Sequence, residues 1–214
     1  MTFLPDIATL AAFTLACLVL VLTPGPDMTL FVGRSLSQGR AAGMASMAGA
    51  AAGNVIHTML AAFGLSALIA ASAEAFFVVK IVGALYLLWL AFQSLRHGSA
   101  LSVSPERGST QKPLSRVFAA GLLVNLLNPK IILFFLTFLP QFVTAGDPDA
   151  AGKLVFLGLY MVAFSLPFCA AMVLMAEGFA RSLRRSPRIM RMIDWLFAGI
   201  IGGFAVKILF ASRA

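Results

Sequence analysis

Two charged residues of opposite sign lie within long apolar stretches of this sequence. Lys130 is the only charged residue in positions 117–142, and Asp27 is the only one in positions 7–33. An ionised side chain in hydrocarbon costs about 2.5 to 3.5 kcal/mol or more, so such groups usually face a bundle interior or a wet cavity. We therefore expect a polar site at which an anion and a cation face each other, or face a zwitterion.

Each charge directly follows a proline. The two motifs are Thr23-Pro24-Gly25-Pro26-Asp27 and Asn125-Leu126-Leu127-Asn128-Pro129-Lys130. Proline removes a backbone donor and crowds the carbonyl four residues earlier, so it kinks or breaks a helix. A shift of 103 residues places Pro26 on Pro129 and Asp27 on Lys130. Interrupted helices at matching positions of two halves are typical of a transporter's binding site.

The composition is that of an integral membrane protein. Of the 214 residues, 60% are hydrophobic and 11% are charged, and the mean hydropathy is +0.95. Soluble domains carry roughly 25% charged residues. The net charge of +8 sits in short loops between apolar runs, which fits the positive-inside rule better than nucleic-acid binding. Cys17 and Cys169 both lie in apolar runs, so we interpret them as buried hydrophobic residues.

The apolar runs predict an all-α protein with six transmembrane helices, the first and fourth broken at proline. Their approximate ranges are 5–32, 41–66, 76–95, 117–142, 153–176 and 195–210. The small residues of the second run suit close helix contact, either within the chain or in a homodimer. We expect a short polar loop holding Arg34 and Arg40 after the first run.

Loop charges predict the orientation. The loops after the first, third and fifth runs carry most of the arginine, so they should be cytoplasmic and both termini should lie outside. Three helices in each half then make the internal similarity an inverted repeat. We assign residues 1–98 to the first repeat, 99–115 to a cytoplasmic linker and 116–214 to the second repeat.

The charged pair suits an amino acid. Lys130 and the exposed backbone donors of a broken helix would stabilise a substrate carboxylate. Asp27 would stabilise a substrate ammonium group. Asp27 could instead only cap the start of a new helix. Asn54, Asn125 and Asn128 can donate and accept, so they suit a polar ligand or hydrogen bonds between helices.

Protons could enter at Asp27 or at His57, whose unperturbed pKa lies near the working pH. His57 could equally be a hydrogen-bonded structural residue. Enzyme motifs are missing from the sequence: it has no Walker loop, no Gly-x-Ser-x-Gly, and no His, Cys and carboxylate cluster with metal spacing. A passive pore would need a continuous polar stripe, whereas the polar residues here gather at one level. An intramembrane enzyme or a scaffold is a further alternative.

With these motifs the sequence resembles the bacterial LysE/RhtB family of amino-acid exporters. The shared features are the two proline motifs, the glycine-rich stretch 39–53, Lys80-x-x-Gly83-Ala84-x-Tyr86-Leu87, and Phe138-Leu139-Pro140-Gln141-Phe142. The resemblance extends over essentially the whole chain. It implies a plasma-membrane exporter of amino acids or related small metabolites, coupled to the proton gradient and without a bound cofactor.

The sequence therefore predicts a secondary transporter of small zwitterions, with a passive channel as the alternative. The predicted partners are an amino acid and the lipid bilayer, and no metal is expected. The predicted substrate contacts are Pro24, Gly25, Pro26, Asp27, Asn54, Asn125, Asn128, Pro129 and Lys130.

Overall fold

The computed structural model describes residues 5–65, 112–143 and 147–176 continuously, and scattered positions between 72 and 96 and between 178 and 206. Every regular element in this described part is helical. The helices are α1 (Ile7–Leu22), α2 (Pro26–Gln38), α3 (Arg40–Leu60), α6 (Leu114–Leu126), α7 (Pro129–Leu133) and α8 (Ala150–Leu174). A π-helical turn, η1 (Ala61–Leu65), extends α3. A second π-helical turn, η2 (Phe134–Phe138), and a 3₁₀ turn, η3 (Leu139–Phe142), extend α7.

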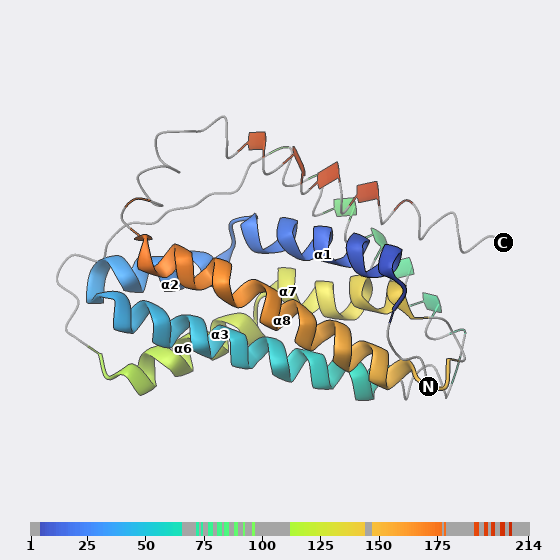
Figure 1. Ribbon diagram of the computed structural model, residues 1–214, viewed down its shortest axis with the longest axis horizontal. Coiled ribbons are helices and arrows are strands. Elements are labelled where there is room, and N and C mark those ends of the chain that lie inside the picture. The colour runs from blue at the N-terminus through green and yellow to red at the C-terminus, as the bar shows by residue number, and fades with distance from the viewer. Residues whose placement is uncertain are drawn as a thin grey trace.

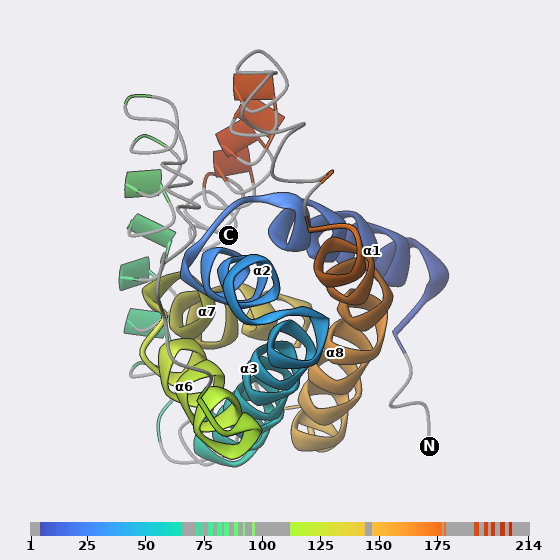
Figure 2. The same cartoon turned by 90° about the vertical axis from the view of Figure 1, so that its left-hand side faces the viewer.

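The helices run side by side along the long axis of the molecule (Figures 1 and 2). By length and composition α8 could cross a bilayer alone, and the bent pairs α1–α2 and α6–α7 could each cross as one span. The predicted runs 76–95 and 195–210 are described only at scattered positions, which are helical. The described residues do not include positions 99–111 of the predicted linker. They also leave out positions 181–190, which hold most of the arginines that follow the fifth run.

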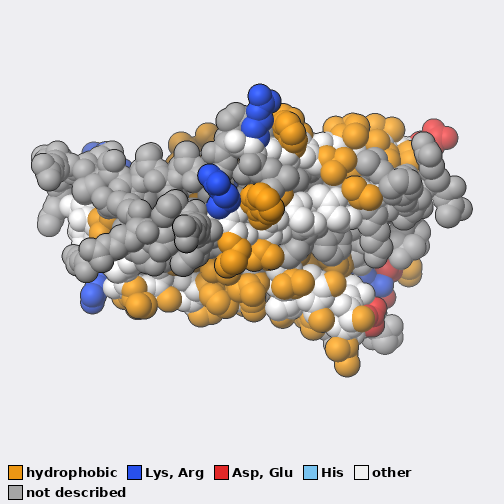
Figure 3. Space-filling view, turned by 90° about the horizontal axis from the view of Figure 1, so that it is seen from above, with side chains coloured by type: hydrophobic (Ala, Val, Ile, Leu, Met, Phe, Trp, Pro, Cys, Tyr) orange, Lys and Arg blue, Asp and Glu red, His pale blue; other side chains and the backbone are white. Residues whose placement is uncertain are grey.

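The surface of the described part is apolar, as a bilayer requires. Large hydrophobic side chains with more than half of their surface exposed occur on several helices, among them Ile7, Leu60, Leu123 and Leu127. Figure 3 shows hydrophobic side chains across one face of the molecule, with the acidic side chains gathered at one end. In water such a surface would mark an aggregation-prone patch, whereas against lipid it carries no penalty.

The first helix break lies between α1 and α2. Asp6 begins α1 by accepting a hydrogen bond from the Thr9 backbone at 2.8 Å. The helix ends at Leu22, because Pro24 and Pro26 have no N–H to continue it and Gly25 is fully extended. Pro26 occupies the first turn of α2, where a missing donor costs nothing, and the axis turns by 50°.

The second break lies between α6 and α7 and is built differently. Asn128 is extended, and its side-chain oxygen accepts the Lys130 backbone N–H at 3.1 Å, so it is the N-cap of α7. Pro129 follows in the first turn, and the axis turns by 51°. Thus two residues of the predicted polar motif, Asn128 and Pro129, build the backbone that presents Lys130.

The expected polar loop around Arg34 and Arg40 is wrong. Arg34 lies inside α2 and Arg40 begins α3, so Gly39 alone connects the two helices. Gly39 has a φ of 90°, a conformation that costs other residues free energy because of their Cβ atom. The chain therefore reverses in one residue, and α2 packs back along α3 (Figure 1).

Glycines bring α3 and α6 into backbone contact. A Cβ atom added at Gly49 would lie 2.1 Å from the Phe118 carbonyl oxygen, and one at Gly121 would lie 2.1 Å from the Ser46 carbonyl oxygen. Only residues without a side chain permit this approach, as in other close helix pairs in membranes. The small-residue face of the second run therefore serves a contact within the chain.

Two buried clusters divide the interior along its length. The aromatic core contains Phe13, Phe134, Phe138 and Phe142 with Tyr160, and the Phe13 ring has its centroid 5.0 to 6.5 Å from those of the other four. The methionine core contains Met28, Phe31, Met47, Met172 and Val173. The first cluster joins α1, α8 and the α7 extension, whereas the second joins α2, α3 and α8.

Gly121→Ala should destabilise the protein, because the new Cβ atom would lie 2.1 Å from the Ser46 carbonyl oxygen and would displace the α3 backbone. Overpacking of this kind costs about 1 to 3 kcal/mol or more. Gly33→Ala is the matched control, since no atom of the described residues lies within 4 Å of a Cβ atom added at this helical position. We expect thermal unfolding in detergent to show a clear loss for the first variant and none for the control. Equal midpoints would contradict the close α3–α6 contact.

Candidate functional site

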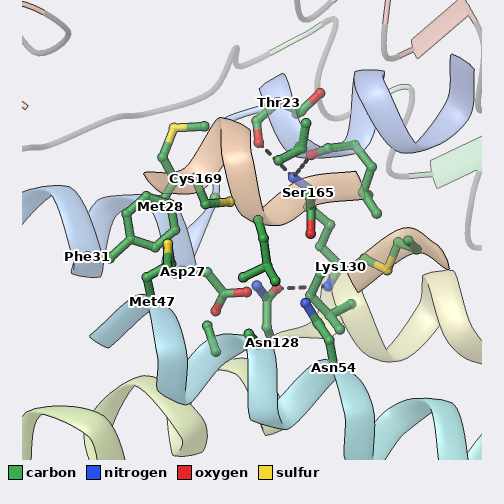
Figure 4. A pocket seen from close by; sticks show the side chains of 18 of the residues that line it. Thr23, Asp27, Met28, Phe31, Met47, Asn54, Asn128, Lys130, Ser165 and Cys169 are labelled. Atoms are coloured by element: carbon green, nitrogen blue, oxygen red, sulfur yellow. Dashed lines mark hydrogen bonds between the residues drawn. The ribbon is translucent and has the colours of Figure 1, made fainter. Parts of the chain in front are cut away.

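A cavity of about 80 Å³ lies at the level of the two helix breaks (Figure 4). This volume is several times what a single water molecule needs. Helices α1, α2, α3, α7 and α8 and the segment between α1 and α2 all contribute to its wall. The polar residues of the wall are Thr23, Asp27, Asn54, Asn128, Lys130 and Ser165. Residues from both buried clusters complete it, so the cavity lies where the aromatic core and the methionine core meet.

The Lys130 ammonium group binds the end of α1. Its Nζ donates to the Leu20 carbonyl at 2.9 Å and to the Thr23 carbonyl at 2.7 Å. These carbonyls belong to the last turn of α1, where the helix dipole is negative and a cation is stabilised. Gly25 lies alongside, since a Cβ atom there would be 3.6 Å from Nζ. A side chain from one broken helix thus satisfies the backbone that the other break exposes.

Asp27 is held by an asparagine behind it. The Asn125 side-chain amide donates to Asp27 Oδ2 at 2.8 Å and to Asn54 Oδ1 at 3.0 Å, and Asn125 is completely buried. Asp27 lies in the first turn of α2, where the helix dipole favours a negative charge. Its other oxygen, Oδ1, is buried but has no hydrogen-bond partner in the described part of the chain. Because buried acceptors are normally paired, this oxygen is a candidate for a ligand's donor.

The remaining predicted site residues lie off the cavity wall. Pro24, Pro26 and Pro129 shape the breaks, and Asn125 stands behind Asp27 and Asn54. His57 is buried on α3, and its ring stacks on Phe135 with a centroid distance of 5.5 Å. Its Nε2 has no hydrogen-bond partner in the described part of the chain. The structure thus separates His57 from the lining residues while leaving it one turn from Asn54.

Sequence reasoning missed the α8 wall of the cavity. Met161, Ser165 and Cys169 all line it, and their four-residue spacing places them on one helix face. Cys17 lines it as well. A signal was present, since Ser165 and Cys169 lie one turn apart in the otherwise apolar second half of α8. Pro167 lies beside them inside α8, which continues as one helix through it. In the described part, no three His, Cys, Asp or Glu residues come together as a metal site.

Comparison with known families identifies the chain. The model of the family described as LysE type translocator matches residues 18–212. The chain belongs to this family. The match includes both helix breaks and all of the residues that line the cavity except Cys17. No solved structure matches the sequence.

Several bacterial proteins are related to this chain over most of their length. It is 31% identical to the protein named uncharacterized membrane protein YahN of Escherichia coli, over 87% of this chain and 82% of that one. It is 29% identical to the homoserine/homoserine lactone efflux protein of Salmonella typhimurium, over 88% and 90%. It is 25% identical to the leucine efflux protein of an Enterobacter species, over 92% of each chain.

Lys130→Met should destabilise the protein, because it leaves the Leu20 and Thr23 carbonyls without this donor. A buried polar group that loses its partner costs about 1 to 3 kcal/mol. Lys153→Met is the matched control. Lys153 lies in the first turn of α8 and pairs with Asp147, which precedes that helix, and ion pairs near the surface contribute little to stability. We expect thermal unfolding in detergent to show a marked loss for Lys130→Met only. If both variants unfolded like the wild type, the contact of Lys130 with these carbonyls would not contribute to the stability of the protein.

Proposed function

We propose that this protein is a secondary transporter that exports amino acids or related small zwitterions across the bacterial plasma membrane, coupled to protons. The observation that carries the proposal is the cavity between the two helix breaks. It holds the ammonium group of Lys130 and a buried carboxylate oxygen of Asp27 that has no hydrogen-bond partner in the described part of the chain. A zwitterion satisfies both signs of charge without bringing net charge into the membrane, which would be costly.

The substrate ammonium donates to Asp27 Oδ1 in this proposal. Asn54 and Asn128 offer amide groups on the same wall, and the substrate carboxylate gains from the positive charge of Lys130. Asn125 does not touch the substrate but fixes the carboxylate of Asp27 and the amide of Asn54. It is therefore a positioning residue, which revises the direct contact expected from sequence.

A carrier mechanism fits the packing better than a pore. The aromatic core packs on one side of the cavity and the methionine core packs on the other, and residues of both clusters line it. We propose that a substrate reaches the cavity when one of these clusters opens. We propose that the chain forms two inverted three-helix repeats and that one repeat rocks against the other about the two breaks. The termini would lie outside and residues 99–115 would be cytoplasmic.

Two relatives support the substrate class. One is named for the efflux of homoserine and its lactone, and another for the efflux of leucine. Homoserine and leucine are zwitterions that differ in the side chain. We therefore extend to this chain the export of small amino acids, with the common zwitterion bound at Asp27 and Lys130.

The proposal is tested by efflux from proteoliposomes that are preloaded with labelled amino acids, with and without an imposed pH gradient. Loss of one or a few compounds that depends on the gradient supports a proton-coupled carrier. Loss of every compound regardless of the gradient indicates a pore. Counterflow, in which unlabelled substrate outside accelerates exit of the label, separates the two independently.

Asp27→Asn should lower gradient-driven efflux at least about tenfold, since a hydrogen bond to a charged group contributes about 1.5 to 3 kcal/mol. Asp6→Asn is the control, because Asp6 caps α1 on the exposed surface and lies far along the chain from the break. The measurement is the initial rate of efflux at equal amounts of reconstituted protein. Wild-type rates for Asp27→Asn would remove this residue from the site.

His57→Phe should keep the stacking on Phe135 but cannot bind a proton. If His57 relays protons, this variant should lose the acceleration of efflux by the pH gradient and keep substrate counterflow, which moves no net protons. Both rates are measured in the same vesicles. Gradient-driven efflux equal to that of the wild type would show that His57 is only a packing residue.

A further inference from the structure

Where the cavity meets the methionine core, three helices pass from a polar lining residue to an apolar one. On the side of the aromatic core, Met161 also lines the cavity, one turn before Ser165. On α2, Asp27 is followed one turn later by Phe31, and on α8, Ser165 is followed by Cys169. On α3, which runs opposite to α2, Asn54 comes two turns after Met47. Each helix thus passes from a polar residue to an apolar one in the same direction. Figure 4 shows Met28, Phe31, Met47 and Cys169 together, away from Lys130 and Asn54.

The apolar side that these residues form is a packed surface of the methionine core. Met28 and Phe31 are each 4% exposed, Met47 is 7% exposed, and Cys169 packs against the same cluster. Met28 directly follows Asp27 in α2, so the apolar side begins where the substrate ammonium binds. An amino acid held there has its Cα within reach of this surface.

We infer that the transported substrate carries an uncharged, apolar side chain, which Met28, Phe31 and Met47 select by contact. This inference rests on the proposed function and names the substrate class of the same site. Within the described wall of the cavity, the only charged side chains are Asp27 and Lys130, and the backbone charges of the zwitterion occupy both. A charged substrate side chain would lie among thioethers and a phenyl ring without a counter-ion, which is strongly unfavourable.

The chemistry of the selecting residues also sets the breadth of selection. Methionine is unbranched, with three rotatable bonds and a polarisable sulfur, so it adapts to groups of different shape. Two methionines beside one phenylalanine therefore accept linear and branched aliphatic side chains alike. We expect leucine, methionine and norleucine to bind, alanine to bind more weakly, and lysine and glutamate to be rejected.

The two native cysteines give a direct assay. Cys17 and Cys169 are the only cysteines of the chain, and both line the cavity. The unmodified protein in proteoliposomes is treated with N-ethylmaleimide, and modification of each cysteine is followed by mass spectrometry. Leucine, methionine and norleucine should slow modification of half-buried Cys169, whereas lysine and glutamate should not. Equal protection by lysine or glutamate would overturn the inference.

A methionine pair on α3 supplies the matched variants. Met47→Ala should lower the preference for leucine over alanine, measured as the ratio of their KM values for efflux, about tenfold. In an apolar pocket, contact with one or a few methylene groups changes discrimination by about this factor. Met44→Ala is the control, since Met44 packs against the same cluster one turn away but does not line the cavity. An unchanged preference in Met47→Ala, with leucine still exported, would overturn the selection by Met47.

These outcomes separate the inference from the proposed function. If no amino acid protects Cys169 and none is exported, the proposed function itself fails and the inference falls with it. If amino acids are exported but charged ones are exported as well as leucine, the function stands and the apolar selection is wrong.

Discussion

The arrangement of the described helices depends on the contact between the Lys130 ammonium group and the end of α1. A helix that stops within a bilayer exposes carbonyls that water cannot reach, so they must be satisfied by the protein. Lys130 supplies two donors to the Leu20 and Thr23 carbonyls and adds a positive charge at the negative end of the helix. The cost of burying the ammonium and the cost of breaking the helix thus offset each other.

The second constraint is the close approach of α3 and α6, which positions the asparagines. A Cβ atom at Gly53 would lie 2.3 Å from Asn125 Oδ1, so the amide of Asn125 occupies space that only glycine leaves open. From there Asn125 reaches Asp27 and Asn54 at once. The glycine face of α3 therefore has two roles: it allows the helices to touch, and it brings a buried donor to the carboxylate at the start of α2.

Sequence reasoning predicted which polar residues the structure brings together at the cavity, but not how these residues pair. Asp27, Asn54, Asn128 and Lys130 could be predicted because polar groups in apolar runs are few and costly. The partners could not, because whether Lys130 binds a backbone carbonyl or a ligand depends on the distance between α1 and α7. The α8 wall was missed because serine and cysteine are common in membrane helices. The reversal at Gly39 was missed because Arg34 and Arg40 suggested a loop.

The hydrogen bonds at the breaks also indicate where motion can occur. Across the two breaks, Asn125 on α6 and Lys130 on α7 donate side-chain hydrogen bonds of 2.7 to 3.0 Å to Asp27 on α2, to Asn54 on α3 and to the carbonyls of Leu20 and Thr23 at the end of α1. Such bonds are directional, and a donor left unpaired in hydrocarbon is costly. The contacts of the aromatic and methionine cores are not directional and can be exchanged for others of similar free energy. The proposed rocking motion therefore has its pivot at the level of the breaks, with rearrangement in the two apolar cores on either side.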